Sequence, residues 1–279
     1  MISTLAALTY PAIDPVAFNL GPISVKWYGL AYLAGLLLGW QYIRRLLTTA
    51  RLWPRSGPPL TVAQTDDLLL WMTLAVVIGG RLGQVVLYDL SYFAAHPSEI
   101  FGLGMRGMSF HGGIIGSAIA IVLYARHVGA SYRSIADLVC AAAPFGLFLG
   151  RIANFINAEH WGRETDAPIG MVFPGGGPLP RHPSQLYEAA LEGVVMFLIL
   201  RYVTHARLGL KKPGLTAGVF FIWYAIARII CEIFREPEPT HILNLGPITA
   251  GQVYSLPMLL IGIWLVTTAR EPAAEKASA

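Results

Sequence analysis

Arginine and glutamate recur at helical spacing inside one apolar stretch of the chain. Tyr224, Arg228 and Glu232 lie four residues apart, so they share one face of a helix. An arginine and a glutamate one turn apart can pair, which lowers the cost of placing both in an apolar environment. Because the planar guanidinium fork matches phosphate oxygens, Arg228 is predicted to bind an anion, with Glu232 orienting it. The alternative is an ion pair that only docks two helices.

A second group of polar residues lies in the run GRIANFINAEHWG, which covers residues 150–162. On a helix, Arg151, Asn154 and Ala158 would share one face, which places the guanidinium beside the amide. The run also contains Asn157, Glu159 and His160. So many polar groups beside apolar segments favour a binding site, whereas snorkelling and helix capping at a membrane surface are the alternative.

His111, Gly112 and Gly113 form a third candidate site. Histidine suits proton transfer because its unperturbed pKa is about 6.5, and glycines let a ligand approach the backbone N–H groups. A single histidine is more often structural, so this motif is weak when taken alone. Tyr28 follows Trp27 at the start of the first apolar stretch, where an aromatic anchor at a membrane interface is the simpler interpretation.

The elements that carry these residues are too apolar for a soluble protein. Of 279 residues, 13% are charged and 55% hydrophobic, and the mean hydropathy is +0.56. Soluble domains carry about 25% charged residues, so the chain is predicted to be an all-α integral membrane protein. This composition excludes disordered and disulfide-rich secreted proteins. We expect no nucleic acid, metal or cofactor, because neither a basic–aromatic cluster nor a metal-ligand spacing occurs, and Cys140 and Cys231 lie in apolar segments.

Apolar runs of the length needed to cross a bilayer, about 20 residues, predict seven transmembrane helices. They lie near residues 24–43, 67–88, 112–126, 135–150, 186–203, 215–234 and 249–268. The third and fourth runs are short or rich in glycine, so six spans with one re-entrant segment remain an alternative. Residues 1–279 are expected to form a single transmembrane domain. A cleavable signal peptide is not expected, since residues 1–23 lack lysine and arginine.

Basic residues are distributed unequally between the two sets of connections. One set holds 12, namely Arg44, Arg45, Arg51, Arg55, Arg126, Arg133, Arg201, Arg207, Lys211, Lys212, Arg270 and Lys276. The other holds six, namely Lys26, Arg106, Arg151, Arg163, Arg181 and Arg235. This bias predicts an extracytoplasmic N-terminus and a cytoplasmic C-terminus. The longest connection, residues 151–185, is rich in proline and glycine and is predicted to form an extracytoplasmic loop or cap.

Five sequence blocks, in order, resemble the prolipoprotein diacylglyceryl transferase family. They are Trp27-Tyr28-Gly29, HGG at 111–113, GRIANFINAEHWG at 150–162, HPSQLYE at 182–188, and Tyr224-x3-Arg228-x3-Glu232-x2-Arg235. The long GRIANFINAEHWG motif is specific by itself, and five blocks in the same order are more specific still. The resemblance covers roughly residues 25–237. Residues 1–20, the 50–60 loop and the C-terminal tail carry no resemblance.

The resemblance implies a multi-pass enzyme of the bacterial plasma (inner) membrane, with its active site near the outer leaflet. Such enzymes transfer the sn-1,2-diacylglyceryl group of phosphatidylglycerol to the lipobox cysteine of a preprolipoprotein signal peptide. A thioether forms and glycerol-1-phosphate leaves, which is the first step of lipoprotein maturation. The implied partners are phosphatidylglycerol, the lipobox peptide and membrane lipids, with no cofactor.

At the matching positions, the resemblance implies roles for individual residues. The expected catalytic set is His111, Arg151, Arg228, Tyr28 and Glu232, with His111 hypothesised to take the thiol proton. The expected substrate-binding set is Arg151, Asn154, Asn157, Glu159, Gly112, Gly113, Tyr224 and Arg235. The central prediction is that Arg151 and Arg228 meet at one phosphate. A transporter, and an intramembrane protease using Ser109 and His111, are the competing functions.

Overall fold

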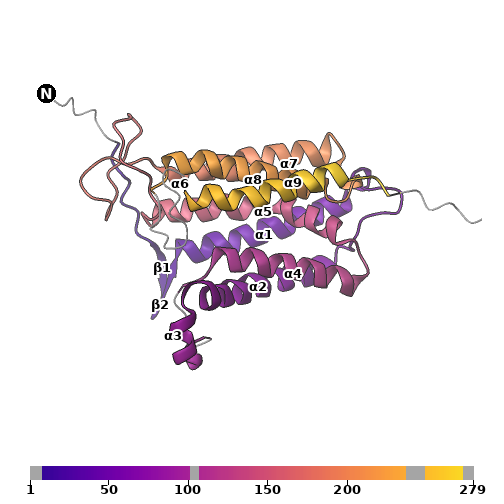
Figure 1. Cartoon of the computed structure of the whole chain (residues 1–279), viewed down its shortest axis with the longest axis horizontal. Helices are drawn as coiled ribbons and strands as arrows, with labels where there is room; N and C mark the ends of the chain where they lie inside the picture. The colour runs from indigo at the N-terminus through magenta and orange to yellow at the C-terminus, as the bar shows by residue number, and fades with distance from the viewer. Residues whose placement is uncertain (1–7, 101–106, 237–248, 273–279) are drawn as a thin grey trace, which may run out of the picture.

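Long helices lie side by side with their ends at two levels (Figure 1). The computed structural model describes residues 8–100, 107–236 and 249–272, and within these ranges it contains seven long helical rods. They are α1 (Trp27–Thr48), α2 (Gln64–Gly83) with the π-helical turn η2 (Gln84–Tyr88), α4 (Phe110–Val128), α5 (Tyr132–Ile156), α6 (Ser184–Glu188) with the π-helical segment η4 (Ala189–Val195) and α7 (Met196–His205), α8 (Leu215–Phe234) and α9 (Ala250–Thr268). Each predicted apolar run lies mainly within one rod.

The third and fourth predicted runs prove longer than the sequence indicated. α4 has 19 residues and α5 has 25. At 1.5 Å per residue they extend about 28 and 37 Å, and the hydrocarbon core of a bilayer is about 30 Å thick. α5 is therefore long enough to cross the hydrocarbon core, and α4 comes close to the length needed.

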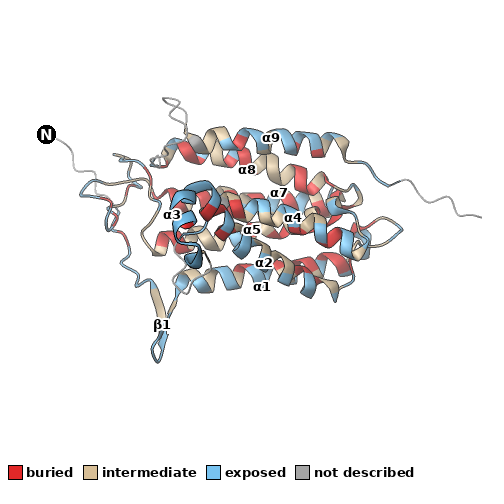
Figure 2. Ribbon diagram, turned by 60° about the horizontal axis from the view of Figure 1, so that its bottom comes forward, coloured by how far each residue is buried: buried red, intermediate tan, exposed pale blue. Residues whose placement is uncertain are grey.

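The outer surface of the bundle is apolar. Leucines and isoleucines of α1, α4 and α9 are exposed, with Leu260 at 67% of its full accessibility (Figure 2). Four helical segments of the described chain are long and apolar enough to cross a membrane, namely Gln64–Tyr88, Tyr132–Ile156, Leu215–Phe234 and Gly251–Thr268. Apolar side chains on such a surface are stable against lipid rather than water, which makes the chain a membrane protein.

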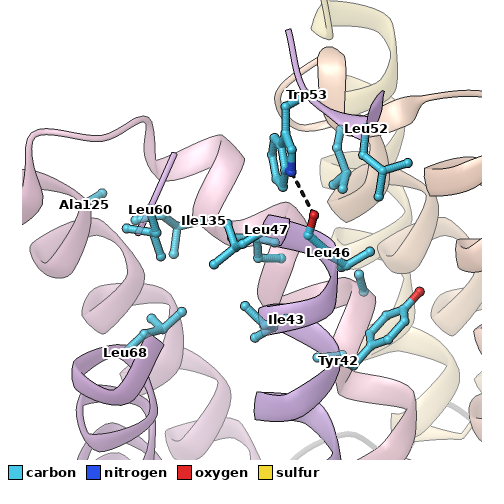
Figure 3. Close-up of a cluster of buried hydrophobic side chains, with 14 of the residues drawn as sticks. Tyr42, Ile43, Leu46, Leu47, Leu52, Trp53, Leu60, Leu68, Ala125 and Ile135 are labelled. Carbon is cyan, nitrogen blue, oxygen red and sulfur yellow. Dashed lines mark hydrogen bonds between the residues drawn. The ribbon is translucent and has the colours of Figure 1, made fainter. Parts of the chain in front are cut away.

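The largest group of buried hydrophobic side chains lies at one end of the bundle (Figure 3). Leu46 and Leu47 of α1 pack there with Leu52 and Ile135, all almost fully buried. The Trp53 indole N–H donates to the Leu46 carbonyl at 2.9 Å, which closes the end of α1. The connections from α1 to α2 and from α4 to α5 lie at this end. The buried hydrophobic side chains therefore fix the helices relative to one another here.

The opposite end, called here the cap end, carries the non-helical structure. The all-α prediction missed a hairpin at this end, formed by β1 (Val16–Leu20) and β2 (Ile23–Lys26). Its turn contains Gly21, whose φ of 59° suits glycine. The short helix α3 (Leu90–Ala95) and the loop of residues 157–183 lie at the same end (Figure 1).

Helices α2 and α4 approach each other through glycine. A Cβ on Gly112 would overlap the Gly79 carbonyl oxygen and crowd Gly83, whereas the nearest atoms to a Cβ on Gly113 lie 3.9 Å away. Small residues at such positions let membrane helices pack closely. The expectation that Gly112 and Gly113 let a ligand approach backbone N–H groups does not fit this packing, because both N–H groups donate to Ser109. Both belong to the first turn of α4, and the Gly112 N–H donates to the capping Ser109 hydroxyl at 3.1 Å.

We expect Gly112→Ala to destabilise the protein by about 1–3 kcal/mol, the usual cost of overfilling a tight contact. The added methyl group must push α4 away from backbone atoms of α2, which cannot move aside as a side chain can. Thermal unfolding in detergent micelles would measure the loss. Gly113→Ala is the matched control, and equal stability of the two variants would contradict the packing role.

Candidate active site

Six charged side chains form one buried group at the cap end, here called the arginine–glutamate cluster. Its members are Arg151, Glu188, Glu192, Arg228, Glu232 and Arg235. They come from α5, from the α6–η4 segment, and from α8 with the residue that follows it. Three positive and three negative formal charges cancel, so the cluster is neutral as a whole.

Glu188 joins all three arginines of the cluster. Its Oε1 accepts from Arg228 Nη1 at 2.8 Å and from Arg235 Nη1 at 3.0 Å. Its Oε2 forms an ion pair with Arg151 Nη1 at 3.0 Å, without hydrogen-bond alignment. Because one carboxylate contacts both Arg151 and Arg228, the two guanidinium groups lie close enough to reach a single small anion. The expectation that they share one site agrees with this geometry.

Glu192 holds the other side of the Arg151 guanidinium. Its Oε2 accepts from Arg151 Nε at 3.1 Å and from Nη2 at 3.0 Å, and the residue is fully buried. The segment η4 can approach α5 because Gly193 packs directly on Phe148, one turn before Arg151. A side chain at Gly193 would separate the glutamate from its arginine.

The pairing expected along α8 is present. Arg228 Nη2 lies 2.6 Å from Glu232 Oε1, one turn along the helix. Tyr224, one turn before Arg228, is buried and interacts electrostatically with Arg151, Arg228 and Glu192. The three residues therefore do share a face, and that face points at α5 and η4.

The carboxylates lie behind the arginines. The Glu188 and Glu192 side chains have 0% accessibility, whereas those of Arg151 and Arg228 keep 16% and 18%. Each guanidinium has five N–H groups, so donors remain beyond those used by the carboxylates. The accessible part of these ion pairs is therefore on the arginines, and the glutamates fix the orientation of the guanidinium groups.

The helix that carries Arg151 ends in a tight C-terminal turn. The Ala158 N–H donates to the Phe155 carbonyl at 3.0 Å and the Glu159 N–H to the Asn154 carbonyl at 3.1 Å, the two bonds of a Schellman motif. Ala158 occupies the left-handed position with φ of 53°. Ala158 therefore lies beyond the end of α5, so only Arg151 and Asn154 share the helical face considered above, and the loop predicted at 151–185 covers only residues 157–183. The run RIANFI contains no helix breaker, so α5 continues to Ile156.

This turn sends the Glu159 carboxylate back onto Asn154. The Asn154 amide donates to Glu159 Oε1 at 2.7 Å, and the Tyr28 hydroxyl lies beside the same amide. Gln185 supports the turn by donating from Nε2 to the Glu159 carbonyl at 2.7 Å. Asn157 Oδ1 is buried and accepts no hydrogen bond from the described part of the chain. Tyr28, Asn154 and Glu159 therefore form a second polar group, anchored on the same helix as Arg151.

His111 lies on α4, which packs against α2 and is not one of the segments that carry the cluster. Its Nδ1 is 3.2 Å from the Tyr88 hydroxyl, and its ring contacts that of Tyr254 with centroids 5.0 Å apart. Tyr254 is one turn along α9 from Gly251, which packs on Glu232. The first turns of α9 thus lie between His111 and the cluster, with Tyr254 contacting His111 and Gly251 contacting Glu232.

Comparison with known proteins gives a consistent result. The family model described as "Prolipoprotein diacylglyceryl transferase" matches residues 15–268. The chain belongs to the prolipoprotein diacylglyceryl transferase family. A phosphatidylglycerol–prolipoprotein diacylglyceryl transferase of Nitrobacter winogradskyi is 52% identical over 266 residues, which cover 94% of this chain and 90% of the relative. A similarly named protein of Rhizobium leguminosarum bv. trifolii is 49% identical, in an alignment that covers 97% of this chain and 96% of the relative. Another, of Brucella anthropi, is 47% identical, in an alignment that covers 99% of this chain and 100% of the relative.

The family match contains every residue of the arginine–glutamate cluster. Sequence reasoning missed two of them as site residues, Glu188 and Glu192. They lie four residues apart, and both are inside the run predicted to span the membrane at 186–203. Ionisable side chains in such a run mark a functional site, so this signal was available to find them. In this transferase fold they are the groups that fix Arg151 and Arg228.

Proposed function

We propose that the chain transfers the sn-1,2-diacylglyceryl group of phosphatidylglycerol to the thiol of a lipobox cysteine in a preprolipoprotein. The observation that carries this proposal is the convergence of Arg151 and Arg228 on Glu188, with both guanidinium groups still partly accessible. Two planar cations at one place suit a phosphodiester. The relatives reported above bear names that specify phosphatidylglycerol, a prolipoprotein and transfer of a diacylglyceryl group.

The reaction forms one bond and breaks another at the same carbon. The cysteine sulfur attacks the glycerol carbon that bears the phosphate, the carbon–oxygen bond breaks, and glycerol-1-phosphate leaves with the bonding electrons. The thiol proton passes to a base, because thiolate is the reactive form of cysteine. Negative charge grows on the leaving phosphate, and N–H groups of Arg151 and Arg228 stabilise it there.

The glutamates contribute by holding these donors in place before the substrate arrives. Glu192 fixes Arg151 through two hydrogen bonds, and Glu232 fixes Arg228. A preorganised guanidinium needs no reorientation as charge develops, which is the main source of electrostatic catalysis. Tyr28, Asn154 and Glu159 are assigned to the substrate glycerol or the incoming peptide.

For the orientation in the membrane, we infer that all seven long rods span the inner membrane with the cap end at the outer leaflet. The basic residues of the larger set occur in the connections at the end opposite the cap, which supports a cytoplasmic location for that end. Arg106 and Lys276, which the charge count includes, lie outside the described residues. The N-terminus is then extracytoplasmic and the C-terminus cytoplasmic.

An assay with purified protein separates the proposed function from its competitors. The protein is incubated with phosphatidylglycerol carrying a labelled acyl chain and a lipobox peptide, and the peptide is analysed by mass spectrometry. A mass increase equal to one diacylglyceryl group supports the transferase. Peptide cleavage without that increase supports an intramembrane protease, although Ser109 serves as a helix cap. With the protein reconstituted in vesicles, passage of unmodified lipid or peptide across the bilayer would support a transporter.

His111 is the proposed acceptor of the thiol proton. We expect His111→Gln to lower the turnover number by about 10²-fold, the usual contribution of a general base. The loss should shrink as pH rises towards the thiol's own pKa, where thiolate forms without help. Transfer rates between pH 6 and pH 9 (roughly from the ordinary histidine pKa to that of cysteine) would measure this. A pH-independent loss, or near-normal turnover, removes His111 from proton transfer.

A further inference from the structure

The chain segment before the hairpin lies against the cap. The Leu8 N–H donates to the Gly170 carbonyl at 2.9 Å, and Leu8 pairs with Met171 in a parallel bridge. These residues precede residue 15, where the family match begins. The segment therefore precedes the residues that the family model matches, yet it contacts the loop that follows α5.

Tyr10 is the buried residue of this segment. It keeps only 8% of its accessibility, and its ring lies against Phe155 and Phe173 with centroids 5.4 and 5.1 Å away. Its hydroxyl is 2.7 Å from the Phe155 carbonyl and 2.9 Å from the Ile156 carbonyl. Burial raises the pKa of this hydroxyl above its usual range, with the Ala158 amide opposing, so the group stays protonated and donates.

The two carbonyls that Tyr10 reaches belong to the last turn of α5. Helix ends leave carbonyl groups without partners inside the helix, and a Schellman motif satisfies only part of them. The Ile156 carbonyl is one such group, and the Phe155 carbonyl also accepts from Ala158. Ala158 itself holds a left-handed conformation that an alanine disfavours. The Tyr10 hydroxyl, a hydrogen-bond donor from outside the helix, therefore stabilises the strained turn that ends α5.

We infer that Tyr10 is a positioning residue for the transfer reaction, and that its hydroxyl holds the turn that places Glu159 against Asn154. The side chains of Asn154 and Glu159 are 2.7 Å apart only because the chain reverses at Ala158. The inference rests on the proposed function to the extent that Asn154 and Glu159 serve the reaction. The positioning itself is a property of the fold.

A double-mutant cycle tests the inference with the full-length protein in detergent micelles. Tyr10→Phe keeps the ring packing and removes the hydroxyl, and we expect it to lower kcat/KM by about two- to tenfold, the effect of one lost hydrogen bond. In the Glu159→Ala background, where the positioned carboxylate is gone, Tyr10→Phe should cost less than about twofold. Tyr202→Phe, at an exposed tyrosine of α7, is the matched control and should keep wild-type kcat/KM.

Equal losses from Tyr10→Phe in both backgrounds, or no loss in the wild-type background, would overturn the inference. Hydrogen exchange of the Ala158 and Glu159 amides gives a readout independent of activity. Tyr10→Phe should speed exchange at these two amides at least severalfold, and Tyr202→Phe should leave it unchanged. If wild-type protein transfers no lipid, the proposed function fails while exchange still decides the positioning, and unchanged exchange refutes it.

Discussion

Replacing Arg228 with lysine is expected to lower lipid transfer by about 10²–10³-fold, the cost of losing one preorganised donor to a developing anion. The guanidinium contacts Glu188 at 2.8 Å through one nitrogen and Glu232 at 2.6 Å through the other. Its remaining N–H groups are left for phosphate. A lysine ammonium keeps the charge but concentrates it at one point on a flexible stem, so it cannot contact both carboxylates and the substrate in one fixed geometry.

The loss should appear mainly in kcat, because the charge that binds the ground-state phosphodiester is retained. Steady-state kinetics with labelled phosphatidylglycerol and a lipobox peptide would measure both parameters. Arg44→Lys is the matched control, since Arg44 pairs with the exposed Asp66 at 3.4 Å, away from the cluster. Wild-type turnover in Arg228→Lys would show that the fork is not needed, and the proposed phosphate site would have to be abandoned.

The helices were predictable because their signal is local. Each apolar run of bilayer length became a rod, and the spacing of Arg228 and Glu232 on a single helix correctly predicted their ion pair. Contacts within one helix depend on the 3.6-residue repeat alone. The same reasoning placed Tyr224 on the cluster-facing side of α8.

The errors arose where one residue's backbone angle or a distant contact decides the structure. Ala158 ends α5 through a positive φ that no alanine signals in a sequence. Gly112 looked like a ligand-binding glycine, yet the partner that requires it is Gly79 on another helix. Tyr10 was invisible for the same reason, since its hydroxyl bonds a carbonyl 145 residues away.

Convergence of the site was predictable only in part. The expectation that Arg151 and Arg228 meet came from motif resemblance and shared depth, and the structure brings them to one carboxylate. That this carboxylate is Glu188 was not predicted, because the contact joins residues on three separate helical segments that no local spacing relates. A buried cation needs a counter-charge, so every glutamate in the predicted spans is a candidate partner for these arginines.

Replacing Glu188 with glutamine is expected to have the largest effect on stability. Three buried or partly buried arginines would then face two carboxylates, and removing one partner of a buried ion pair costs about 3–5 kcal/mol. The amide keeps the shape and one acceptor oxygen but loses the charge that Arg151, Arg228 and Arg235 share. Thermal unfolding in detergent should therefore start well below the wild-type temperature, and transfer activity should fall with the loss of arginine alignment.

An added anion distinguishes this charge imbalance from simple misfolding. Inorganic phosphate or glycerol phosphate that binds the unpaired guanidinium groups stabilises the folded state by mass action, so it should raise the unfolding temperature of Glu188→Gln more than that of wild type. The control is Glu164→Gln, because Glu164 is exposed and pairs with Arg181 at 3.4 Å outside the cluster. If phosphate shifts Glu188→Gln no more than it shifts this control, the arginines are not held open for an anion by Glu188. The cluster would then be a structural lock between α5, η4 and α8, and the phosphate would have to bind elsewhere.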